Sequence, residues 1–535
     1  MLFTSYEFLA FIGILFLLYY VVPKKFQWIL LLGASYLFYA MADWSYLVFI
    51  LVTTVSAYFA ACAMEKTYTD QKAYLLLHKS EMNKDERKAF KAVQKKKRWH
   101  CLLLILFLNL GILAVLKYTN FAIANLNGIL TFTGSTRQLD YLNLLLPMGI
   151  SFYTFQTLGY LIDVYRGKYP AERNLAKLAL FVSFFPQLVQ GPISRFDDLS
   201  VSLFEEHTLN WQNVSFGLER ILWGYFKKLV IADRIVIGVN TIIHNPDQYR
   251  GTFVFVGMLF YAFELYCDFT GGIDITIGVA EVMGIRVTEN FKRPFFSKCI
   301  KEYWNRWHIT MGSWFTDYIF YPISVCGPML KLGKWSRKHL GEQIGKRVSV
   351  YLSCIVVWFT TGIWHGASWN FIVWGLGNCV VILISQEFEP LYRLFYQKME
   401  GKGIHLQGNF GWKVFQVTRT VLLMSCLRLF DCYRDVPLTF RMFGTMFTNW
   451  NWNNLSGASF LELGLNGWDY LVLILGLLLV FTVSMVQRSG SVRMKIADMP
   501  GIIRFGLWYG LFLIVLILGA YGVGFDASQF IYNQF

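Results

Sequence analysis

Apolar runs about as long as a bilayer is thick are the feature that most constrains the fold of this chain. Residues 101–116, 470–486 and 505–521 form three such runs without a charged residue. A transmembrane helix needs about 20 predominantly apolar residues. Charged residues make up 16% of the 535 residues, against about 25% in soluble domains. The sequence therefore predicts an all-α polytopic membrane protein.

Segments of this kind recur along the whole chain. We expect about 11–13 transmembrane helices, centred near residues 14, 33, 54, 109, 152, 183, 225, 260, 356, 378, 421, 478 and 513. The first has no basic region before it, and its lysines follow it, so we predict a retained helix and not a signal peptide. Residues 118–140 and 431–468 are more polar and are predicted to be loops.

The positions of the basic residues indicate an orientation. The formal net charge is +15, and residues 65–100 are rich in lysine and arginine. Counting crossings places this segment on the same side as Lys24 and Lys25. Cytoplasmic loops carry an excess of Lys and Arg, so residues 65–100 are predicted to be a basic cytoplasmic loop, with the N-terminus outside. Anionic lipid then accounts for the charge, and no nucleic-acid partner is expected.

Several classes of chemistry have no signature here. Gly271 and Gly272 lack the lysine and the spacing of a phosphate-binding loop. The nine cysteines include no Cys-x-x-Cys pair, so neither a disulfide framework nor a zinc site is predicted. No metal and no tightly bound cofactor are expected.

The segment from Glu264 to Pro322 has an unusual composition. It is too polar to cross bare lipid and too aromatic for a free loop. Irregular backbone at membrane depth is tolerated only where protein or a water-filled cavity surrounds it. We therefore predict a re-entrant or interfacial layer of short helices in this segment.

Two histidines differ from the other six, which lie in polar or basic segments. His308 and His365 both lie among tryptophans and glycines. On one helix His308 would share a face with Trp304, and Glu302 would pair with Arg306. An interfacial aromatic belt explains His308 equally well, and a hydrogen bond between helices explains His365. Ionisable groups inside membrane segments are nevertheless usually functional, and a desolvated, neutral imidazole can accept a proton.

Residues 364–375, WHGASWNFIVWG, resemble the signature of the membrane-bound O-acyltransferase (MBOAT) family. Residues 302–323 are similar to that family's second histidine block. Further segments resemble its bacterial alginate and peptidoglycan O-acetyltransferase branch, namely residues 181–195, 265–285, 289–296 and 530–535. Four positions depart from that branch: Thr270 and Ile273 stand where serines are usual, Gly272 where a tyrosine is usual, and Asn533 where a phenylalanine is usual.

The resemblance implies a single membrane domain, residues 1–535, with helices around a central funnel or tunnel. Its parts would be N-terminal helices (1–64), the basic cytoplasmic loop (65–100), a catalytic core (141–390) and C-terminal helices (410–535). The resemblance also implies that His365 is the catalytic base and that His308 lies at the cytoplasmic mouth. The further site residues it suggests are Trp304, Asn305, Trp364 and Trp369 for the substrate, and Asp268, Asp274 and Asp317 for support.

The implied reaction is transfer of an acetyl group from acetyl-CoA, or another cytoplasmic acyl thioester, to an extracytoplasmic polysaccharide. The transfer would be direct or would use a secreted SGNH-type partner, at a bacterial cell membrane. D-alanyl transfer to teichoic acid from a carrier-protein thioester is the alternative within the family. A non-enzymatic channel or export scaffold is the alternative outside it.

Overall fold

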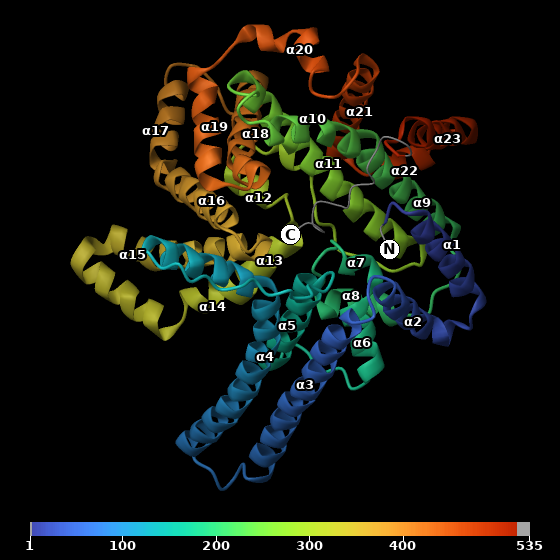
Figure 1. Ribbon diagram of the computed structural model, residues 1–535. Coiled ribbons are helices and arrows are strands. Elements are labelled where there is room, and N and C mark those ends of the chain that lie inside the picture. Colours follow the sequence, from blue (N-terminus) through green and yellow to red (C-terminus); the bar gives the residue numbers. More distant parts are fainter. Residues whose placement is uncertain (1–2, 522–535) are drawn as a thin grey trace. The chain divides into compact units, whose positions relative to one another are not determined.

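The computed structural model describes residues 3–521, and within that range the regular secondary structure is all helical, without a strand (Figure 1). The chain divides into two compact units. The first comprises Met1–Gly217 with Thr276–Thr288, and the second comprises Leu218–Ile275 with the chain from Glu289 onward. The motif at residues 530–535 lies outside the described residues.

Seven helices in the described range are long and apolar enough to cross a membrane, which confirms a multi-pass membrane protein. They are α3 (Tyr46–Leu77), α4 (Lys84–Phe132), α11 (Thr252–Val282), α15 (Gly327–His365), α16 (Trp369–Glu387), α21 (Gly467–Val486) and α23 (Gly501–Leu518). The apolar α1 (Tyr6–Val21) is shorter. Five further predicted segments are helical but shorter or more polar, so the full number of crossings stays a prediction: α2 (Gln27–Ala40), α5 (Ile150–Arg166), α6 (Leu175–Ser183), α9 (Trp211–Tyr225) and α18 (Phe410–Tyr433).

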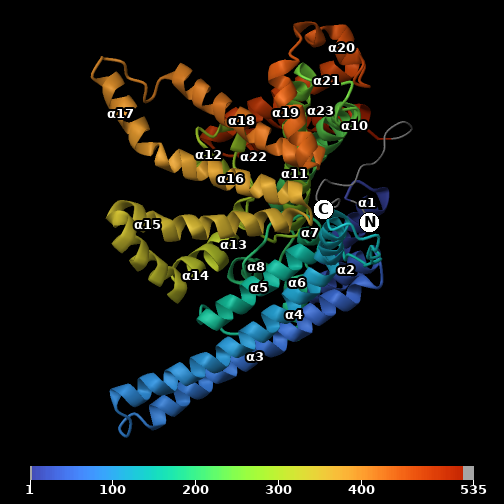
Figure 2. The same cartoon turned by 60° about the vertical axis from the view of Figure 1, so that its left-hand side comes forward.

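The predicted basic loop is instead the end of a long helical hairpin in the first unit. Helices α3 and α4 lie side by side in both views (Figures 1 and 2). Lysine, glutamate, alanine and glutamine favour helix. Both helices therefore continue into the highly charged residues of this segment. The hairpin turns at Asn83, whose side chain accepts hydrogen bonds from the backbone N–H groups of Asp85 and Glu86 in a capping box.

Both predicted polar loops are also partly helical. Helix α4 continues to Phe132. From within this helix, the side chains of Asn120 and Asn127 hydrogen-bond the backbone of the extended segment that follows it, at Leu142 and Leu139. Residues 431–468 include α19 (Val436–Thr448) and α20 (Gly457–Leu461). In each case a polar composition rich in asparagine, threonine and glycine was interpreted as a loop, although part of the segment is helical.

The segment Glu264–Pro322 divides into two kinds of structure. Its first part belongs to α11, one continuous helix, so the prediction of a re-entrant layer was wrong there. Most of α11 is buried by protein, and two of its carboxylates, Asp268 and Asp274, pair with cations, so this part of the helix avoids contact with bare lipid. The rest forms short helices, as predicted: η3 (Pro294–Phe296), α12 (Ile300–Trp304), α13 (Ile309–Phe315), η4 (Thr316–Phe320) and α14 (Tyr321–Ser324).

In the second unit, α15 bends at Gly341, where the backbone has φ of 80°. Its second half packs along α16, and α16 packs against α18 (Figure 2). The remaining helical elements are η1 (Lys24–Phe26), α7 (Phe185–Leu188), α8 (Phe196–Phe204), η2 (Phe226–Ala232), α10 (Asp233–His244), α17 (Glu389–Glu400), η5 (Trp452–Leu455), η6 (Gln487–Ser489) and α22 (Val492–Ala497).

Candidate active site

Two glycines bring α15 and α16 into close contact just before His365. A Cβ atom built on Gly362 would lie 2.5 Å from the carbonyl oxygen of Phe371, and one on Gly375 would lie 2.5 Å from that of Trp358. Neither position can hold a side chain without separating the helices. The close approach places the end of α15 against the first turns of α16, where the aromatic residues of the motif lie.

His365 is the last residue of α15 and is enclosed by aromatic rings. Its side chain is buried, and its ring centroid lies 4.7 Å from that of Trp374 and 5.0 Å from that of Trp364. The Phe371 ring stacks at 6.4 Å. Trp364 is buried, whereas Trp369 is 57% exposed at the start of α16. The imidazole therefore lies in an apolar enclosure that excludes bulk water.

His308 does not share a helix with Trp304, contrary to the sequence prediction. Helix α12 ends at Trp304, and His308 adopts a left-handed conformation (φ 50°) immediately before α13. Such a backbone is uncommon for a residue other than glycine and marks functional or strained positions. The predicted ion pair between Glu302 and Arg306 does form, at 2.5 Å.

Asn290 fixes the backbone immediately after this bend. Its carbonyl accepts the backbone N–H of Ile309 at 2.9 Å. Its side-chain oxygen accepts the backbone N–H of Thr310 at 3.1 Å and the Thr310 hydroxyl at 2.9 Å. These bonds compensate for the cost of the left-handed conformation, so the orientation of His308 depends on Asn290.

The His308 ring is completely buried. It contacts Phe269 at 5.0 Å and Trp364 at 5.8 Å between ring centroids. Burial and the positive charge of Arg428 lower the pKa of His308 to about 3, so its imidazole is neutral at physiological pH. The Trp364 ring thus contacts both histidines, which joins the two sequence motifs in one site.

Arg428, in α18, is a member of the site that the sequence analysis missed. It is buried, and its guanidinium lies 4.9 Å from the ring of Trp374, 5.1 Å from that of Trp307 and 5.9 Å from that of Trp304. Asp431 lies 3.5 Å away. A buried cation between aromatic faces gains cation–π stabilisation. Its signal in the sequence was an arginine and an aspartate inside an apolar helix, a pattern that is costly and usually functional.

Of the other predicted site residues, two aspartates occupy a buried ionic cluster. Asp274 accepts hydrogen bonds from Lys227 at 2.6 Å and from Arg220 at 2.9 Å, and Asp268 pairs with Lys228 at 2.6 Å. A buried charge needs such a partner to offset its desolvation, so these contacts agree with a supporting role. The three cations were not predicted.

The remaining predicted positions differ in exposure. Asn305 and Asp317 are both exposed on the short helical layer, whereas Trp304 is partly buried and its ring lies 5.9 Å from that of Trp374. Within residues 3–521 no group of three His, Cys, Asp or Glu side chains has the arrangement of a metal site. The chemistry available at the site is therefore that of two enclosed imidazoles with a buried cation nearby.

Comparisons with known proteins show the family of this chain. The model of the membrane-bound O-acyltransferase family matches residues 170–427, which include both histidines. The probable alginate O-acetylase of Pseudomonas putida is 32% identical over 84% of this chain and 81% of its own length. The peptidoglycan O-acetyltransferase of Helicobacter pylori is 28% identical over 73% and 70%, and the teichoic acid D-alanyltransferase of Bacillus subtilis is 30% identical over 46% and 60%. The chain therefore belongs to the membrane-bound O-acyltransferase family and is a membrane-embedded acyltransferase, not a channel or export scaffold.

Proposed function

We propose that this protein transfers an acetyl group from a cytoplasmic acyl thioester to hydroxyl groups of an extracytoplasmic polysaccharide, at a bacterial cell membrane. Acetyl-CoA is the proposed donor, and the transfer is either direct or uses a secreted SGNH-type acyltransferase as intermediary. The observation that carries the proposal is the pair of enclosed imidazoles, His308 and His365, which both contact the indole ring of Trp364. General base catalysis of acyl transfer requires such a neutral, positioned imidazole.

In the proposed reaction His365 removes the proton from the acceptor hydroxyl. The oxygen attacks the thioester carbonyl carbon, the C–O bond forms, and the tetrahedral intermediate collapses with cleavage of the C–S bond. The thiolate leaves, and the proton held by His365 returns to it. Water exclusion by Trp364 and Trp374 protects the thioester from hydrolysis. An acyl-His365 intermediate is the alternative route.

His308 is proposed to orient the donor or the acceptor. A neutral imidazole offers one N–H donor and one acceptor nitrogen, and its low pKa keeps it in that form. Trp304, Trp364 and Trp369 are proposed to line the substrate path. Asn305 and Asp317 are exposed, so a role for either requires contact with the donor or with another protein.

The extent of the similarities favours acetyl over D-alanyl transfer. The alginate O-acetylase relative aligns with 84% of this chain, whereas the teichoic acid D-alanyltransferase aligns with 46%. The shorter match also spans less of the relative's own length. D-alanyl transfer remains a defined alternative, because that relative shares the family.

The test uses the full-length protein in proteoliposomes with radiolabelled acetyl-CoA outside and cell-wall or exopolysaccharide acceptor inside. We expect thiol release and label in the glycan with the wild type, and neither with His365→Gln, which keeps the side-chain volume. His405→Gln, at an exposed histidine, is the matched control and should retain full activity. Full transfer by His365→Gln would disprove its role as base. Transfer from a D-alanyl carrier thioester but not from acetyl-CoA would establish the alternative donor.

A further inference from the structure

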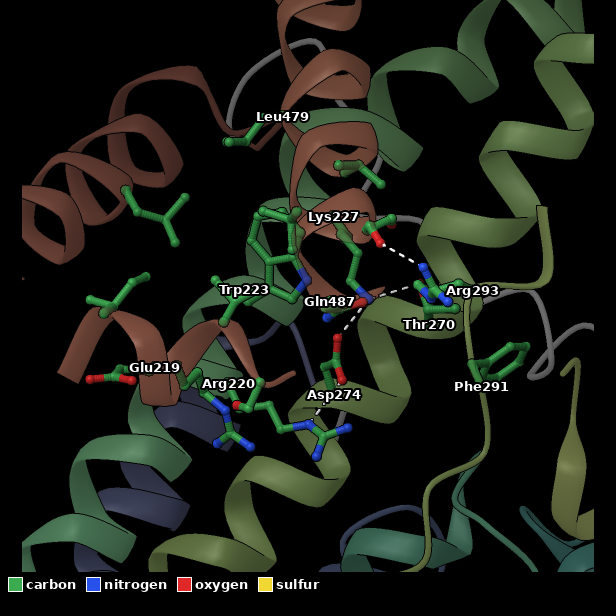
Figure 3. Close-up of a pocket in the computed structure, with 18 of the residues that line it drawn as sticks. Glu219, Arg220, Trp223, Lys227, Thr270, Asp274, Phe291, Arg293, Leu479 and Gln487 are labelled. Atoms are coloured by element: carbon green, nitrogen blue, oxygen red, sulfur yellow. Dashed lines mark hydrogen bonds and ion pairs between the residues drawn. The ribbon is translucent and has the colours of Figure 1, made fainter. Parts of the chain in front are cut away.

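A cavity in the second unit borders the candidate site, because Asp274 and Ile309, the residue after His308, belong to its lining. It encloses about 920 Å³ and is lined by η2, α11, the segment after α11, and the C-terminal helices α21 and α23 (Figure 3). Most of the charged lining comes from α9, η2, α11 and the segment after α11 and is called the charged end below, whereas the lining from α21 and α23 is mostly apolar and is called the apolar end. This division of the walls is the observation from which the ligand class is inferred.

The charged end carries an excess of positive charge. Its lining includes six basic side chains, namely Arg220, Lys227, Lys292, Arg293, Arg488 and Arg493, and three acidic ones, Glu219, Asp274 and Glu289. Asp274 bridges Lys227 and Arg220 in Figure 3, and Glu289 takes up two further N–H groups of Arg220. The carboxylates Asp274 and Glu289 are therefore already committed to two of the cations.

Arg293 lies close to other cations. Burial and the nearby charges of Arg306 and Arg488 lower the pKa of Arg293, which is the signature of positive charge that is incompletely neutralised. Arg293 donates a hydrogen bond to the carbonyl of Ser484 at 3.3 Å, which directs its guanidinium toward α21. Arg488 is exposed at the end of that helix. An anion placed between these side chains would relieve the repulsion.

The apolar end lies between two membrane-spanning helices. Its lining includes Leu479 and Val483 of α21 and Leu507 and Ile514 of α23. Almost none of α23 is buried by protein, so its apolar surface is available to lipid. Gly506 and Gly510 also line the cavity, and a Cβ atom on either would meet nothing within 4 Å. The space beside them has room for a hydrocarbon chain.

We propose that this cavity binds an anionic phospholipid, with its phosphate between Arg293 and Arg488 and an acyl chain along the glycine face of α23. The shared chemistry is a phosphate joined to an apolar chain, and a soluble phosphate compound would satisfy only the charged end. The membrane-facing apolar wall selects the lipid, because it is covered only if a chain fills it. The proposal is independent of which acyl donor the enzyme uses.

The test measures binding of phosphatidylglycerol and phosphatidylcholine to purified, delipidated full-length protein, with retained lipid quantified by mass spectrometry. We expect saturable binding of phosphatidylglycerol and little of phosphatidylcholine. Each basic residue near a membrane surface contributes about a fivefold preference for anionic lipid. Arg488→Gln should therefore weaken binding about fivefold and Arg293→Gln/Arg488→Gln about 30-fold. Arg504→Gln removes one exposed charge outside the cavity and should change nothing.

A second pair of variants tests the apolar end without changing charge. Gly510→Leu should fill the chain path and weaken phosphatidylglycerol binding by at least as much as Arg488→Gln. Gly13→Leu, at an equally open position on α1, should have no effect. Equal retention of both lipids, or unchanged binding by the double arginine variant and Gly510→Leu, would overturn the proposal. Binding of inorganic phosphate or coenzyme A in place of the lipid, with the same arginine dependence, would overturn the lipid assignment and identify a soluble phosphate ligand.

Discussion

Replacing Gly375 by alanine tests whether the α15–α16 contact positions His365. The added Cβ would lie 2.5 Å from the Trp358 carbonyl oxygen and 3.1 Å from the Cα of Gly362. Both neighbours are backbone atoms and cannot rotate away. The helices would therefore have to separate by roughly 0.9 Å to reach an ordinary contact distance.

The expected cost has two parts. Overpacking of this kind destabilises a protein by about 1–3 kcal/mol, which should lower the thermal unfolding temperature by a few degrees. A displacement of about 1 Å near reacting groups can lower the rate about 100-fold, and Trp374 and His365 are the groups that would move apart. We therefore expect Gly375→Ala to lower the rate of acyl transfer about 100-fold and the thermal unfolding temperature by only a few degrees.

Gly377→Ala is the matched control on the same helix. Its Cβ would meet only the end of the flexible Leu427 side chain, at 3.3 Å, and alanine is favoured over glycine in a helix by up to about 1 kcal/mol. The assay combines acetyl transfer in proteoliposomes with fluorescence-detected thermal unfolding in detergent. Wild-type activity and stability in Gly375→Ala would refute the role assigned to the close helix contact.

Three further predictions concern the site. The pKa of His308 is lowered from 6.5 to about 3 in the folded protein. On acidification the unfolded chain therefore binds a proton at this imidazole before the folded chain does, and stability should fall as the pH drops from about 6.5 toward 3. His308→Gln should show a shallower decline in unfolding temperature over that pH range. Arg428→Met should destabilise the protein by about 3–5 kcal/mol, because it leaves Asp431 buried without the cation it pairs with. The double variant Arg428→Met/Asp431→Asn should recover most of the loss in unfolding temperature. No recovery would contradict the pairing. Asn290→Ala removes the side-chain acceptor for Thr310 and should reduce acetyl transfer at normal protein abundance; unchanged kcat would show that His308 is positioned without it.

Much of the site was predictable from sequence because its motifs are local. The Trp-His-Gly segment identified His365, and the short helices around His308 followed from polar, aromatic composition at membrane depth. Arg428 was missed because its contacts with three tryptophans come from elements far apart in the chain. The conformation of His308 was missed because helical spacing was assumed across Asn305, where α12 had already ended.

Sequence alone determined that this protein lies in a membrane and that it belongs to the class of acyltransferases. Long uncharged apolar runs leave a bilayer as their stable environment, and two histidine motifs in one chain indicate the acyltransferase family. Only the tertiary structure decided which buried charges lie beside the histidines and which side chains contact one another in the site. Burial beside Arg428 makes His308 neutral, and the backbone contact between Gly362 and Gly375 brings Trp374 to His365. Both effects arise from packing between distant segments, which residue spacing along the chain does not encode.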